Sequence, residues 1–242
     1  QGCNQLKELS LSDCPRLTDL SILSIMSDLK ISSSYSYNYA LQLDPGVGLS
    51  NLRFVTGLKA VENLELRLST LADTTPFLEC PWILNVKLKL ESWNIDLSSF
   101  RHCKSLDISC NDESGTHQWA YDLPSLTSLE VTGGSHLFDS LQAPEIEDVR
   151  LSMATVGTLR GLSSARSFHA STSTLASLDG LGPVQELRLW DCTIENFNGI
   201  ESALITELDL TKGNYAGLAR VGHISTLQTL KFNSALTSAE LL

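Results

Sequence analysis

The residues that could support catalysis or metal binding are few and scattered. Five histidines occur, at positions 102, 117, 136, 169 and 223, and none has the spacing of a metal ligand. The chain contains no glycine-rich phosphate loop, no Gly-x-Ser-x-Gly nucleophile turn and no His-Glu-x-x-His zinc motif. We therefore expect no catalytic residue, no metal site and no cofactor in this segment.

The six cysteines, at positions 3, 14, 80, 103, 110 and 192, form no Cys-x-x-Cys pair. We expect buried, reduced thiols, because free cysteine is among the most buried residue types. A Cys3–Cys14 bridge that caps the start of the chain is the alternative. Reduced cysteines and the absence of Asn-x-Ser/Thr sequons favour the cytoplasm, or the host cytosol if the protein is a secreted effector.

Residues typical of binding occur together in the stretch V-Q-E-L-R-L-W-D-C, residues 184–192. Leu187 and Leu189 alternate with Arg188 and Trp190, which predicts a strand with one buried face. The Leu187 position recurs at residues 41, 64, 86, 106, 129, 149, 168, 208 and 230, in steps of 19 to 23 residues. Such a period indicates a repeat protein, in which each repeat packs only on its neighbours.

The repeats resemble the leucine-rich-repeat superfamily, with its L-x-x-L-x-L-x-x-N/C pattern. The first repeat, C-N-Q-L-K-E-L-S-L-S-D-C, is similar to the cysteine-containing subtype, and phrases such as T-L-A-S-L-D-G-L are similar to internalin-like short repeats. The resemblance implies an α/β horseshoe-type solenoid with a parallel β-sheet on its concave face, short 3-10 or irregular convex turns and little α-helix. We expect a single domain over residues 1–242, of about 11–12 coils, and a segment of a longer protein.

The register is irregular between residues 29 and 45. A second frame falls on Met26, Leu29 and Ile31, but Leu29 is only 12 residues before Leu41, too few for a full coil. The alternation of Tyr35–Leu43 with polar residues predicts a strand or an edge hairpin that interrupts the array. The alternative is that Leu29 is not a true coil position and one repeat is degenerate.

Residues on either side of each frame leucine are expected to point out onto the concave face, since strand side chains alternate. Trp190 is the one aromatic residue there apart from the ring of His169. Tryptophan and arginine are enriched in binding hot spots. We therefore predict a contact patch made of Trp190, Arg188, His169, Arg150 and Asp209. Alternatively, Trp190 covers its neighbours' stems and the sheet edge. A second, basic cluster consists of Arg67, Lys87 and Lys89.

The net charge of −11 disfavours nucleic acid as a partner and mildly favours a basic protein surface. No run of about 18 apolar residues predicts a membrane span. The expected function is protein–protein recognition without catalysis. Two alternatives are a substrate-recognition domain of a larger effector or ubiquitin-ligase-type enzyme, and an immunity or inhibitor protein against a basic enzyme. The sequence determines neither the partner nor the oligomeric state.

Overall fold

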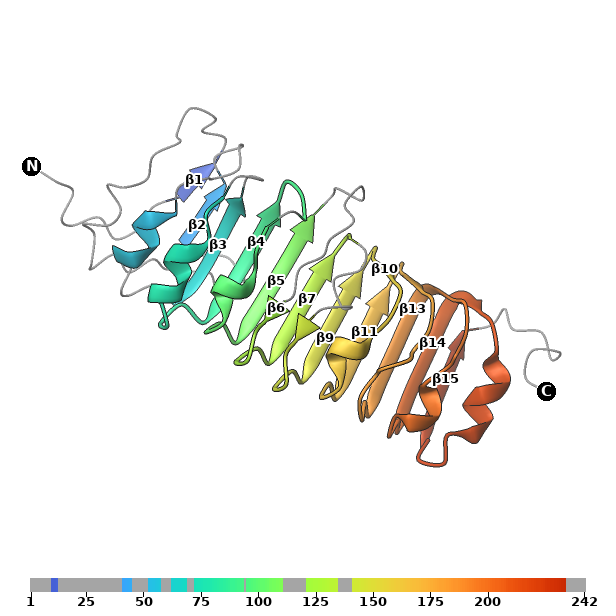
Figure 1. Ribbon diagram of the computed structural model, residues 1–242. Helices are drawn as coiled ribbons and strands as arrows, with labels where there is room; N and C mark the ends of the chain where they lie inside the picture. The colour runs from blue at the N-terminus through green and yellow to red at the C-terminus, as the bar shows by residue number, and fades with distance from the viewer. Residues whose placement is uncertain are drawn as a thin grey trace, which may run out of the picture. The chain divides into compact units, whose positions relative to one another are not determined.

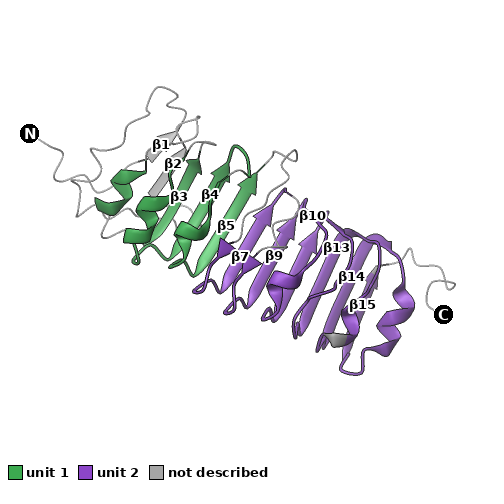
Figure 2. Ribbon diagram, viewed as in Figure 1, with its two compact units in different colours: residues 1–112 green, residues 113–242 purple. Residues whose placement is uncertain are grey.

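A computed structural model describes residues 10–12, 41–44, 52–57, 62–68, 72–93, 95–110, 121–134 and 141–233. The chain divides into two compact units, Gln1–Asp112 and Glu113–Leu242, and each is described by itself (Figure 2). Within each unit, short strands lie side by side and 3-10 helices connect them (Figure 1). The described residues contain no α-helix.

Unit 1 is a stack of parallel strands in chain order. Its strands are β1 (Ser10–Ser12), β2 (Leu41–Asp44), β3 (Asn63–Leu68), β4 (Asn85–Leu90) and β5 (Ser105–Cys110). Leu41 pairs with Leu64, Leu64 with Val86, and Val86 with Leu106. The repeat positions found in the sequence are therefore direct neighbours in the sheet. The connecting 3-10 helices are η2 (Arg53–Gly57), η3 (Thr75–Glu79) and η4 (Ser98–Phe100).

Unit 2 repeats this arrangement with β7 (Ser128–Thr132), β9 (Asp148–Ser152), β11 (Ser167–Ser171), β13 (Glu186–Ile194), β14 (Glu207–Tyr215) and β15 (Thr229–Asn233). A second parallel ladder joins β10 (Thr155–Val156) and β12 (Thr174–Leu175) to the end of β13, and a third pairs β6 (Tyr121–Asp122) with β8 (Leu141–Gln142). The 3-10 helices are η6 (Arg160–Leu162), η7 (Ile200–Ser202) and η8 (Leu218–His223). The parallel register and the 3-10 connections confirm the predicted class, a leucine-rich-repeat solenoid.

The core consists of the frame residues stacked coil upon coil. Each of the following is at most 1% exposed: Leu64, Val86, Leu106, Leu129, Val149, Phe168, Leu187 and Leu208. This burial agrees with the predicted register, because a shift by one residue would expose all of them. Leu230 differs, with 42% of its surface exposed, since β15 pairs with β14 alone among the described strands.

The order of the first described strands bears on the irregular stretch at residues 29–45. Strand β1 pairs directly with β2, Leu11 opposite Leu43, whereas the frame at Leu29 was expected to lie between them. Leu41–Asp44 pairs in parallel with both β1 and β3, as the other strands of the stack do. Residues 13–40, which include the tyrosines at 35, 37 and 39, lie outside the described residues.

Four cysteines, Cys80, Cys103, Cys110 and Cys192, are free and buried, as predicted. Cys3 and Cys14 lie outside the described residues. The thiol of Cys103 donates to the carbonyl of Ile83 at 3.6 Å. Burial, with a smaller effect of neighbouring Cys80, raises the pKa of Cys103 from 9.0 to about 12.

This raised pKa predicts a loss of stability in alkali. An unfolded chain ionises Cys103 near pH 9, whereas the folded chain keeps it protonated to about pH 12. The contribution is therefore complete below pH 9 and is lost as the pH rises from 9 to 12. We expect the urea midpoint of the wild type to fall more steeply over this range than that of Cys103→Ala. Equal slopes would contradict a buried, protonated thiol.

Candidate protein-binding surface

The outward face of unit 2 carries three rows of side chains, each row crossing the strands. The middle row places Arg150, His169, Arg188 and Asp209 directly opposite one another on β9, β11, β13 and β14. Trp190 lies in the adjacent row, between Ser171 and Thr211. The structure thus brings together all five residues of the patch predicted around Trp190.

The third row contains Asp148, Glu186 and Glu207, and these acidic residues lie close to basic side chains of the middle row. Arg188 forms ion pairs with Glu186 on its own strand and, at 3.9 Å, with Glu207 on β14. Nε2 of His169 lies 3.3 Å from Glu186, and Nε of Arg150 lies 3.1 Å from Asp148. A bond from Lys231 at 2.6 Å, and secondarily the charges of Arg188 and His169, lower the pKa of Glu207. These pairs fix the long side chains against the sheet.

Trp190 remains exposed at the margin of this face. The side chain of Trp190 is 47% exposed, although the frame residue before it, Leu189, is 1% exposed. Lys212 lies nearest, with Nζ 5.5 Å from the centroid of the indole ring. About half of the indole is therefore accessible to a partner, and the other alternative, that Trp190 covers its neighbours' stems, is represented by its contact with Lys212.

The row that contains Trp190 is followed directly by a tight turn in each of four successive coils. Four residues without the conformational freedom of glycine adopt positive φ angles there, Met153 (52°), Thr172 (50°), Asp191 (54°) and Lys212 (46°). At two of these turns the amide bonds to the next coil: Met153 N donates to the Ser171 carbonyl at 3.0 Å, and Thr172 N to that of Trp190 at 2.9 Å. These bonds offset the cost of the left-handed backbone. The residue that follows is small and buried at three of these turns, Ala154, Ser173 and Cys192, and burial of the last was predicted.

Tyr215 anchors the turn beside Trp190. The hydroxyl of Tyr215 donates to the carbonyls of Leu189 at 3.0 Å and Lys212 at 3.2 Å. It therefore ties the strand that bears Trp190 to the turn that bears Lys212. Sequence reasoning missed both Tyr215 and Lys212. Tyr215 aligns with Ile194 and Leu175, which are core residues of the preceding coils. A tyrosine at a core position needs a hydrogen-bond partner for its hydroxyl, and this was the signal that could have identified it.

Tyr215→Phe is expected to lower the free energy of unfolding by about 1–3 kcal/mol, the usual effect of leaving a buried polar group without its partner. Burial raises the pKa of Tyr215, so its contribution is complete below pH 10 and is lost as the pH rises further. Urea denaturation of both proteins at pH 7 measures the loss. An unchanged midpoint would mean that the hydroxyl contributes no net stability.

Unit 1 contains the predicted basic cluster, but its lysines are paired. Nζ of Lys87 lies 2.9 Å from Asp107, and Nζ of Lys89 lies 3.0 Å from Glu65. Glu65 was expected to be exposed on this face, yet it is 7% exposed beneath its ion pair. Arg67 lies in the same row as Lys89. The cluster is consequently less positive than the sequence suggests.

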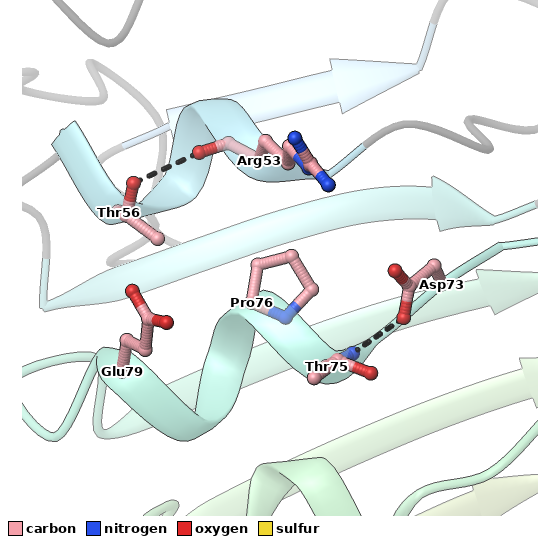
Figure 3. Close-up of a pocket in the computed structure, with 6 residues that line it drawn as sticks. All are labelled: Arg53, Thr56, Asp73, Thr75, Pro76 and Glu79. Carbon is pink, nitrogen blue, oxygen red and sulfur yellow. Dashed lines mark hydrogen bonds between the residues drawn. The ribbon is translucent and has the colours of Figure 1, made fainter.

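A surface hollow lies on the other side of unit 1, between η2 and η3 (Figure 3). Arg53 and Thr56 line it from η2, and Thr75, Pro76 and Glu79 from η3, with Asp73 beside them. The pKa of Asp73 is lowered, first by hydrogen bonds from Thr75 and then by the charge of Arg53. Within the lining, Thr75 N donates to Asp73 at 3.1 Å and the hydroxyl of Thr56 donates to the Arg53 carbonyl at 3.0 Å.

Metal-binding and membrane-spanning features concern only the part of the chain that the structure describes. There, no group of three or more histidine, cysteine or acidic residues has an arrangement that could hold a metal ion. None of the helices in the described ranges has the length and hydrophobicity of a membrane span.

The architecture places the protein among leucine-rich-repeat solenoids, and a solved structure of that kind is similar to it. It is an internalin, inlF, from Listeria monocytogenes str. 4b F2365, with a TM-score of 0.52, 15% sequence identity, and coverage of 90% of this chain and 72% of that one. At this identity the likeness establishes the fold alone. No protein-family model matches the chain, and no curated protein matches it.

Proposed function

We propose that this chain is a protein-recognition module and that its partner binds the outward face of unit 2 around Trp190. The observation that carries this proposal is the half-exposed indole on a face that is otherwise polar. Tryptophan is one of the residues that dominate interface energetics.

The surroundings of Trp190 support a rigid recognition surface. Ion pairs hold Arg188 and Arg150 against the sheet. A hydrogen bond of 2.5 Å from Thr211 to Asp209 orders a third side chain. A surface whose side chains are ordered before binding loses less conformational entropy on association. The ordered side chains support recognition by this face. Its charged groups include Arg150, Arg188 and Asp209 of the middle row.

A capture experiment tests the proposal. Immobilised wild type, Trp190→Ala and Leu204→Ala proteins are incubated with an extract of the source organism, and the retained proteins are identified. Leu204 is a matched control, because it is an apolar residue of unit 2 with 52% exposure outside the patch. The dissociation constant of the purified partner is then measured for all three proteins.

We expect Trp190→Ala to weaken binding about 30-fold or more, as at a hot spot of 2 kcal/mol. Leu204→Ala is expected to bind as the wild type does. The urea midpoints of the three proteins should agree, which separates a lost contact from a lost fold. An affinity of Trp190→Ala within twofold of the wild type would refute the role of this face.

A further inference from the structure

The indole of Trp190 already holds a cation from its own chain. Nζ of Lys212 lies 5.5 Å from the ring centroid, within the distance at which a cation is attracted to an aromatic face. Among the described residues, Lys212 forms no ion pair. Its side chain is exposed, so a competing cation can reach the same ring.

Two acidic residues close to Trp190 in the strand pairing, Asp209 and Asp191, form no ion pair among the described residues. Asp209 is opposite Arg188 and Lys231 in the sheet, but both of these side chains reach Glu207 instead. Asp209 accepts only the hydroxyl of Thr211, at 2.5 Å. Asp191 follows Trp190 directly and is exposed. The margin of the patch thus combines an aromatic face with two carboxylates that form no ion pair among the described residues.

We propose that Trp190, Asp209 and Asp191 form a receptor for a basic side chain of the protein partner, and that Lys212 is its resident competitor. This inference rests on the proposed function and specifies the chemistry of the partner. Arginine fits better than lysine, because a planar guanidinium stacks on the indole and donates to carboxylates at the same time. The net charge of −11 attracts such a partner from a distance.

The competition requires only a side-chain movement. The carbonyl of Lys212 accepts the hydroxyl of Tyr215 at 3.2 Å, so the turn itself stays in place. The side chain of Lys212 leaves the ring when the arriving cation occupies it. Removal of the lysine side chain should therefore strengthen the binding of a cation, a result that a merely structural Lys212–Trp190 contact does not predict.

A small-molecule titration tests this without the natural partner. N-acetyl-arginine N-methylamide is added at constant ionic strength, and the indole N–H resonance of Trp190, assigned with Trp190→Phe, is followed by NMR. The citrulline analogue has nearly the same shape without the charge. Thr172→Ala is the matched backbone control, because Thr172 occupies the equivalent left-handed turn with φ of 50° and carries no cation.

We expect a saturable shift with the arginine compound and none with citrulline. Lys212→Ala should lower the dissociation constant about two- to fivefold, the value of an exposed cation–π contact, and Asp209→Asn should raise it. Thr172→Ala should have no effect. Equal responses to both compounds, or an affinity in Lys212→Ala that is unchanged or weaker, would overturn the inference. Either result leaves the capture experiment with Trp190→Ala to decide the proposed function separately.

Discussion

Phe168→Ala is expected to lower the free energy of unfolding by about 3–5 kcal/mol. The side chain of Phe168 is fully buried and stands between Val149 of β9 and Leu187 of β13 in the core of unit 2. Alanine would leave a cavity that both neighbouring coils line. Because each coil packs only on its neighbours, they cannot collapse into the space without losing their own register. Urea denaturation followed by circular dichroism measures the loss.

The next residue in the same strand is the control. His169 lies on the outward face and pairs with Glu186, so His169→Ala should change the stability by no more than about 0.5 kcal/mol. The two positions differ by one residue, and strand side chains alternate between faces. If His169→Ala proved the more destabilising of the two, the register of the whole unit would be wrong by one residue.

The sequence was sufficient to predict this register because the signal is repeated. One alternation of leucine and polar residues around Leu187 would be weak evidence. The same pattern at Phe168 and Leu208, at nearly constant spacing, leaves few other arrangements that bury every frame residue. Leu29 lacked this support: it is too close to Leu41, and the strand β1 pairs directly with β2.

The details of the candidate site depend on features that periodicity does not encode. The left-handed turns fall on Met153, Thr172, Asp191 and Lys212, residues without a common preference for positive φ. At Met153 and Thr172, bonds to the next coil stabilise that conformation, and these bonds exist only in the stacked structure. Periodicity likewise gives no role to the hydroxyl of Tyr215, which bonds to the turn at Lys212.

The ion pairs of the outward face could not be predicted from the sequence either. Alternation places Lys87 and Arg188 on the outward face, but it does not say which acid each one reaches. Lys87 pairs across strands with Asp107, while Arg188 turns from Asp209, its direct neighbour, to Glu186 and Glu207. Because Arg188 pairs with Glu186 and Glu207, Asp209 has no ion pair among the described residues. Its negative charge therefore remains near Trp190.

Gly182→Ala is expected to destabilise unit 2 by about 2–3 kcal/mol, through close contact between coils. A β-carbon at position 182 would overlap the backbone carbonyl group of Ser163 in the preceding coil. The amide of Gly182 also donates to the carbonyl of Leu162 at 3.3 Å, so the two segments cannot separate without losing this bond. The obstructing atoms belong to the backbone, and no side-chain rotation relieves the overlap.

Gly222→Ala is the matched control, since a β-carbon there would meet no atom within 4 Å. Position 222 lies within η8, where alanine restricts the unfolded chain and should raise the stability by up to about 1 kcal/mol. Urea midpoints of both variants, compared with the wild type, should therefore shift in opposite directions. Equal shifts would mean that the loss arises from glycine's backbone freedom in general. A loss confined to Gly182→Ala would show that the close approach of successive coils limits which residues the return path accepts.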